Sequence, residues 1–132
     1  MRPRFLLDTN VVIRWLYEPR RLSREQTRVL TAAEESGEPV AISAMTLLEV
    51  VTAVESGRVK GQIQDILDQL SASARFQIFP ITTEIASEMT LIRQSLDDQT
   101  DRVIVATARV HRLKLLTSDQ RIIDSRLVAV ID

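Results

Sequence analysis

Short apolar segments alternate with longer segments of helical periodicity along this chain, and this alternation constrains the fold more than any other feature. The sequence predicts short strands at residues 5–7, 40–42, 76–79, 115–117 and 127–130. It predicts helices at residues 10–17, 23–36, 43–57, 60–74, 82–96 and 101–111. Strands that alternate with helices form a parallel sheet covered by helices on both faces. We therefore expect an α/β fold, a three-layer α/β/α sandwich with a central, mostly parallel sheet.

Length and composition suit a single globular unit. The chain has 132 residues, so we expect residues 1–132 to form one domain. Hydrophobic residues make up 45% and charged residues 27%, which is typical of a globular rather than a disordered chain. Cysteine is absent, which excludes disulfides, thiolate metal sites and cysteine nucleophiles. No apolar run is long enough to span a membrane and no signal-peptide core is visible, so we expect a cytoplasmic protein with no membrane association.

Several kinds of functional site are missing from the sequence. The three glycines form neither a phosphate-binding loop nor a dinucleotide fingerprint, and no nucleophile elbow occurs. The single histidine, His111, lies in the apolar helix at 101–111, where it is expected to pack or cap. The chemistry must therefore come from carboxylates.

Four carboxylates are predicted to meet at one edge of the sheet. Asp8 follows the first predicted strand and Asp119 the fourth, whereas Glu49 lies about two turns into the helix after the second strand. Asp101 begins the apolar helix, so its place at this edge is inferred from the direction of that helix. Ligands of open parallel sheets bind outside the carboxyl ends of the strands. These four acids are the candidate site.

Each carboxylate taken singly also has a structural interpretation. Asp8 and Asp119 can cap the helices that follow them, and Asp101 in a first helical turn complements the helix dipole. Glu49 lies opposite the apolar arc of its helix, where a side chain faces either bulk water or a wet cleft. These alternatives stay open for each residue alone.

Together, the four carboxylates would repel one another. Two carboxylates about 5 Å apart cost roughly 3 kcal/mol at an effective dielectric constant of 20, against a total stability of about 5–15 kcal/mol for a small domain. A cluster of this kind must bind cations or take up protons. Oxygen ligands without cysteine or histidine favour Mg²⁺ or Mn²⁺. Such ions promote phosphodiester hydrolysis without a histidine base.

Four segments carry these acids in a recognisable series, namely residues 5–10 (FLLDTN), 43–49 (SAMTLLE), 98–108 (DQTDRVIVATA) and 116–119 (LTSD). In order and spacing they resemble the PIN-domain ribonucleases, especially the VapC-type toxins. The resemblance implies a metal-binding, catalytic centre of Asp8, Glu49, Asp101 and Asp119. The supporting residues that it implies are Thr9, Asn10, Asp98, Thr117 and Ser118. Gln99 and Thr100 depart from the proline and the aromatic or small residue common in the family, which weakens the case for Asp98 more than for Asp101.

The resemblance also implies an activity and partners. It implies an endoribonuclease dependent on Mg²⁺ or Mn²⁺ that cuts transfer, messenger or ribosomal RNA. It implies a homodimer and a small antitoxin protein that occupies the cleft, with operator DNA bound only by the toxin–antitoxin complex. Trp15, Leu16 and Tyr17 can be interface anchors or core residues. The arginines of the first two helices can grip RNA or an acidic antitoxin segment, or form a solvated face; they include Arg20, Arg21, Arg24 and Arg28.

Two other functions compete with this one. In a haloacid-dehalogenase-like phosphatase Asp8 would be the nucleophile, but Asn10 stands where the second acid belongs and no lysine lies in a suitable later motif. A non-catalytic PIN-like module would hold RNA or a protein, yet a pure binder has no physical reason to keep a full set of repelling acids.

Overall fold

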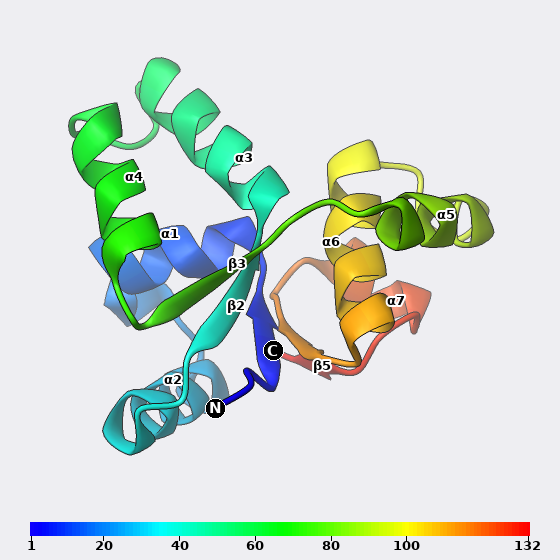
Figure 1. Ribbon diagram of the computed structural model, residues 1–132, viewed down its shortest axis with the longest axis horizontal. Coiled ribbons are helices and arrows are strands. Elements are labelled where there is room, and N and C mark those ends of the chain that lie inside the picture. Colours follow the sequence, from blue (N-terminus) through cyan, green and yellow to red (C-terminus); the bar gives the residue numbers. More distant parts are fainter.

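The computed structural model describes residues 1–132 as a five-stranded parallel sheet between two helical layers (Figure 1). All neighbouring strands pair in parallel, in the order β3-β2-β1-β4-β5. The strands are β1 (Phe5–Leu7), β2 (Val40–Ser43), β3 (Phe76–Phe79), β4 (Lys114–Leu116) and β5 (Val130–Ile131). The predicted three-layer fold is confirmed.

Seven α-helices and one 3-10 helix connect the strands. They are α1 (Thr9–Tyr17), η1 (Pro19–Arg21), α2 (Arg24–Ser36), α3 (Ala44–Glu55), α4 (Ile63–Ala72), α5 (Thr83–Leu91), α6 (Gln99–His111) and α7 (Gln120–Ser125). No helix combines the length and the apolar character needed to cross a membrane.

Side chains along the central strands point alternately to the two faces of the sheet, and this divides the hydrophobic core into two clusters. Phe5 and Leu7 of β1 pack with α1, α2, α3 and α4 in a cluster of 17 buried residues, whereas Leu6 faces a cluster of 13 that includes α5, α6 and α7. Leu116 and Leu115 of β4 divide between the same two clusters. Successive side chains of a strand point to opposite faces, so these short apolar strands can support two helical layers at once.

Three predicted elements differ most clearly from the observed ones. Residues 60–74 were expected to be helical, but α4 is shorter because Gly61 has a φ of 140° and Ser73 is extended. The helix expected to reach residue 96 ends at Leu91; Ile92 and Leu96 are nevertheless buried, so their apolar character reflects packing rather than helix. The last strand was expected at 127–130, but β5 begins at Val130 and extends to Ile131, so only one residue is shared.

A buried glutamine fixes α2 to the C-terminal end of the sheet. Gln26 belongs to a capping box with Ser23 and has no solvent-exposed surface. Its Nε2 donates to Ser118 Oγ at 3.1 Å and to the carbonyl oxygen of Ile131 at 3.2 Å. Because a buried amide needs partners, these bonds define the position of α2 against β5.

Leu115→Ala should destabilise the protein by about 2–5 kcal/mol, because Leu115 is fully buried in the central sheet and alanine would leave a cavity. Leu91→Ala is the matched control, since Leu91 is 74% exposed and should change stability by less than about 0.5 kcal/mol. Urea unfolding followed by circular dichroism measures both. Equal effects of the two substitutions would contradict the assignment of Leu115 to the core.

Candidate active site

Asp8 is held at the end of β1 by a complete set of hydrogen bonds. It caps α1, and its Oδ1 accepts from the backbone N–H of Thr9 at 2.9 Å. Its Oδ2 accepts from Thr117 Oγ1 at 2.7 Å, and its own N–H donates to the carbonyl of Leu116. The side chain is buried, so the carboxylate has one fixed orientation.

Thr117 connects this carboxylate to the next strand end. It is fully buried directly after β4, and its Oγ1 both donates to Asp8 and accepts from the backbone N–H of Asp119 at 3.1 Å. Asp119 caps α7 by accepting from the N–H of Arg121 at 3.0 Å. One hydroxyl thus sets the relative positions of two predicted site acids.

Glu49 reaches the same edge from α3. Thr9 Oγ1 donates to its carboxylate, and the same oxygen lies 3.0 Å from Thr46 Oγ1. Because Thr9 has only one hydroxyl proton, Thr46 must donate to Thr9, and the chain runs from Thr46 through Thr9 to Glu49. The side chain of Glu49 is half-buried, so it faces a cleft rather than bulk water.

Asp98 and Asp101 lie at the N-terminal end of α6. Asp98 caps this helix, its Oδ1 accepting from the N–H of Asp101 at 2.9 Å. Asp101 Oδ2 is buried and has no hydrogen-bond donor. Arg121 Nη2 lies 3.0 Å away and compensates the charge, but its angles do not make a hydrogen bond. Asp101 therefore keeps unused capacity to bind a cation.

Arg121 is a member of the site that the sequence did not predict. Its Nη2 lies 2.9 Å from Asp119 Oδ2 and 3.0 Å from Asp101 Oδ2, so a single guanidinium pairs with both acids. The available signal was its place two residues after Asp119, in the first turn of a helix. Arg58, which donates to Asn10 Oδ1, was also missed.

These carboxylates and the two arginines line one cleft of about 500 Å³. The sequence-predicted residues among its lining are Asp8, Thr9, Asn10, Glu49, Asp98, Asp101 and Asp119. Thr117 lies behind the cleft wall as the partner of Asp8, whereas Ser118 bonds Gln26 and lies outside it. A larger hollow of about 930 Å³ opens elsewhere, but no carboxylate lines it. The predicted convergence of acids is therefore found in the smaller cleft.

Burial and repulsion between the carboxylates raise the pKa values of the acids, whereas hydrogen bonding from Arg121 lowers the pKa of its neighbour. Burial raises the pKa of Asp8, and burial together with Asp8 and Asp98 raises the pKa of Glu49. Burial, followed by the charges of Asp98 and Asp119, raises the pKa of Asp101 to about 6. Hydrogen bonding from Arg121 lowers the pKa of Asp119. The five carboxylates that line the cleft thus outnumber its two guanidinium groups, those of Arg58 and Arg121.

The oxygen chemistry of the donor set suits a hard divalent cation, although its present spacing does not enclose one. All the candidate ligands are oxygens, and the buried Oδ2 of Asp101 lacks a donor. No three acidic or histidine side chains are grouped closely enough to enclose a metal ion. Arg121 lies against Asp101 and Asp119, and Glu49 accepts from Thr9. The residues that could hold an ion are Asp8, Glu49, Asp101 and Asp119.

Comparison with known proteins identifies the family to which the chain belongs. A family model described as the PIN domain matches residues 5–126. The chain belongs to the PIN-domain family. It is 32% identical over 120 residues to Ribonuclease VapC22 of Mycobacterium tuberculosis (strain ATCC 25618 / H37Rv), covering 89% of this chain and 88% of that protein. The resemblance to PIN-domain ribonucleases of the VapC type is confirmed.

Two solved structures extend the likeness to the fold. A toxin–antitoxin complex from Klebsiella pneumoniae contains a chain 29% identical to this one with a TM-score of 0.66, covering 96% of this chain and 95% of that chain. FitAcB from Neisseria gonorrhoeae matches at 26% identity and a TM-score of 0.70, covering 97% and 96% of the two chains. The PIN-domain fold therefore extends over nearly the whole length of all three chains.

Asp101→Asn should stabilise the protein at neutral pH in the absence of divalent ions. Between about pH 4 and 6 the folded protein holds more protons on this carboxyl than the unfolded chain, so the contribution of Asp101 to stability falls as the pH rises. We expect a gain of about 1 kcal/mol at pH 7.5, reduced from the full shift by solvent screening, and no gain near pH 4. Urea unfolding with EDTA at both pH values measures the difference. A loss of stability at both would mean that the ion pair with Arg121 outweighs the repulsion.

Proposed function

We propose that this protein is a metal-dependent endoribonuclease that hydrolyses RNA phosphodiester bonds and acts as the toxin of a toxin–antitoxin pair. Membership of the PIN-domain family and similarity to Ribonuclease VapC22 support this function. The main structural support for this function is the cleft, where five carboxylates meet and their negative charge is only partly neutralised. They are Asp8, Glu49, Asp98, Asp101 and Asp119. We assign the activity to one domain formed by residues 1–132.

The cofactor that suits this cleft is Mg²⁺ or Mn²⁺. PIN-domain nucleases use divalent metals, and the oxygen ligands of Asp8, Glu49, Asp101 and Asp119 suit these two ions. When bound, such an ion lowers the pKa of water and offsets the charge of a phosphate under attack. Thr9 and Thr117 would keep the carboxylates in fixed orientations, as their hydrogen bonds to Glu49 and Asp8 do here.

The remaining residues of the cleft would handle the substrate. Arg58 and Arg121 provide guanidinium groups at the cleft, and guanidinium pairs well with phosphate oxygens. Glu49, whose pKa is raised chiefly by burial, accepts the hydrogen bond at the end of the hydroxyl chain that runs from Thr46 through Thr9, and this bond would keep its carboxylate at the cleft. Asn10 Oδ1 accepts from Arg58, so it would position that arginine rather than touch RNA.

The expected partners are an RNA substrate and a cognate antitoxin protein. The solved neighbour from Klebsiella pneumoniae is a toxin–antitoxin complex, which supports an antitoxin partner. We further propose a homodimer, a cytoplasmic location, and contact with operator DNA only through the antitoxin complex. Trp15 packs edge-on against Phe76, so it supports the core, whereas Tyr17 is 40% exposed and remains available as an interface anchor.

A non-catalytic PIN-like binding module is the alternative. It would share the fold but take up no divalent ion. The haloacid-dehalogenase-like alternative has no support from the family match, and Asn10 engages Arg58 instead of supplying a second acid.

Asp8→Asn should reduce Mn²⁺-dependent cleavage of a mixed RNA pool by at least about a hundredfold, because it removes a charged candidate ligand from the end of β1. Asp65→Asn is the matched control, since Asp65 is an exposed acid of α4. Gel analysis of the RNA and calorimetry with Mn²⁺ give the two readouts. Equal cleavage by wild type and Asp8→Asn would place the activity elsewhere, and absence of Mn²⁺ uptake would favour the binding module.

Arg121→Gln should increase the affinity for Mn²⁺ about three- to tenfold. The guanidinium neutralises Asp101 and Asp119 at short range and competes with an incoming cation for the same carboxylates. Arg20→Gln serves as control because Arg20 is exposed in η1 and has no ion pair. Calorimetric titration of the metal-free proteins measures the change. Unchanged affinity would show that the arginine does not compete with the ion.

A further inference from the structure

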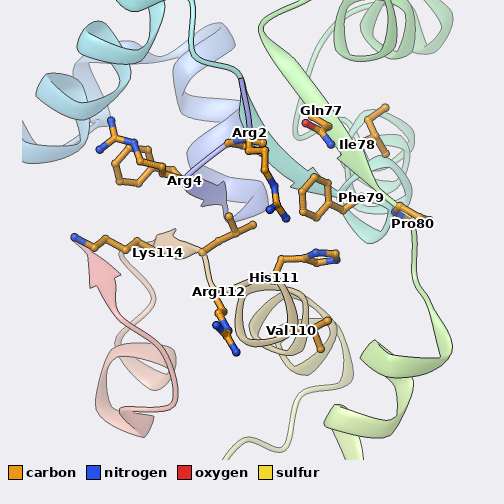
Figure 2. A pocket seen from close by; sticks show the side chains of 13 residues that line it. Arg2, Arg4, Gln77, Ile78, Phe79, Pro80, Val110, His111, Arg112 and Lys114 are labelled. Carbon is orange, nitrogen blue, oxygen red and sulfur yellow. The ribbon is translucent and has the colours of Figure 1, made fainter.

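We propose that the protein has a second ligand site, an anion pocket at the opposite end of α6 that takes the phosphate group of a nucleotide. The pocket is a hollow of about 930 Å³ between the C-terminal end of α6, the start of β4, the residues before β1, and β3 (Figure 2). Because α6 has 13 residues at about 1.5 Å each, its two ends lie roughly 20 Å apart. The pocket is therefore distinct from the acidic cleft.

The charge of this pocket is positive. Four cationic side chains line it, namely Arg2, Arg4, Arg112 and Lys114, and no acidic residue does. Arg4 is compensated: its Nε donates to Glu38 at 2.6 Å and its Nη2 at 3.2 Å, and its guanidinium lies over the ring of Phe5. Arg2, Arg112 and Lys114 are exposed and belong to no ion pair of the chain. Three cations at one hollow therefore lack counterions in a protein of net charge −1.

Helix capping explains only part of this charge. Cations near the C-terminal end of a helix are favoured by the helix dipole, which accounts for Arg112 at the end of α6. Arg2 comes from the opposite end of the chain and is no part of that helix. In Figure 2 the side chain of Arg2 reaches toward Phe79, whereas the charged ends of Arg112 and Lys114 point away from His111 in two other directions.

The wall of the pocket contains a polar atom that the protein does not use. His111 packs edge-on against Phe79, with ring centroids 4.4 Å apart, which confirms the packing role expected for it. Its Nε2, however, is buried and has no hydrogen-bond partner. Buried polar atoms without partners are rare, and a ligand in the hollow would reach this one only if the ring of His111 turned toward it.

The cationic and apolar residues that line the pocket together suit a phosphate attached to an organic group. Guanidinium groups bind phosphate through paired hydrogen bonds, and an ammonium group adds a point charge. The volume far exceeds that of one phosphate and lies within the range of small-molecule sites, and Phe79, Pro80 and Val110 supply apolar surface. A phosphate attached to an organic body, as in a nucleotide, fits this lining. The phosphate can belong to a free nucleotide or to the 5′ end of an RNA chain.

The single histidine of the chain makes the test site-specific. The ring protons of His111 give one set of NMR signals, which report directly on the pocket wall. The full chain is titrated in EDTA, so that the acidic cleft holds no divalent ion. The probes are inorganic phosphate, adenosine, adenosine 5′-monophosphate, and one short RNA with and without a 5′-phosphate.

Adenosine 5′-monophosphate should shift the His111 signals saturably and adenosine should not. The double variant Arg2→Gln with Arg112→Gln should lose at least about tenfold in affinity for the phosphorylated probe, whereas Arg20→Gln with Arg93→Gln, which removes two exposed arginines elsewhere, should not. All four positions are exposed, so both variants keep the fold.

The probes also distinguish the two sources of phosphate. Tighter binding of the 5′-phosphorylated RNA than of the mononucleotide supports an RNA end, and equal or weaker binding supports a free nucleotide. Equal shifts by adenosine and its monophosphate, no shift at all, or full affinity in the Arg2→Gln/Arg112→Gln variant would overturn the proposal. Because the assay contains no divalent ion and measures no cleavage, its outcome is independent of the proposed nuclease activity.

Discussion

The hydrogen bond from Thr117 to Asp8 is the contact on which the acidic cleft depends. It joins the ends of β1 and β4, which are neighbours at the centre of the sheet, and it is buried at 2.7 Å. An ionised carboxylate is stable in such a place only if its oxygens are hydrogen-bonded, and Asp8 has donors on both. The other acids are then arranged around a carboxylate that cannot turn away.

The electrostatics of the cleft follow from this fixed position. Asp101, Asp119 and Glu49 approach a buried negative charge, and the protein responds in three ways. Arg121 pairs with two of the acids, Thr9 donates to the third, and the pKa of Asp101 rises to about 6. These responses are incomplete, since a buried oxygen of Asp101 has no donor. The remaining repulsion between carboxylates is thus confined to the acidic cleft, where a bound cation would reduce it.

The sequence predicted the layers and the convergence of acids because both depend on simple periodic rules. Apolar strands that alternate with amphipathic helices have few folded arrangements, and parallel strands present their carboxyl ends at one edge. This is why Asp8 and Asp119 could be placed together although they are far apart in the chain.

Other features depend on packing between remote elements and were beyond such rules. The end of α5 at Leu91 was missed because the buried Ile92 and Leu96 continue the apolar pattern through turns. Arg121 was missed because its partner Asp101 comes from another helix, and Ser118 bonds Gln26 rather than the cleft for the same reason. The pairing of Arg121 with Asp101, and that of Ser118 with Gln26, joins remote segments and has no local signature in a single sequence.

The order of elements has a consequence for biosynthesis. The cleft needs Asp8 from the end of the first strand and Asp119 from beyond the fourth, and α2 is fastened through Gln26 to the carbonyl of Ile131 in β5. A chain still emerging from the ribosome lacks these C-terminal parts, even where its N-terminal half has begun to fold. The complete cleft can form only after the segment that contains Asp119 has been synthesised and has folded against β1.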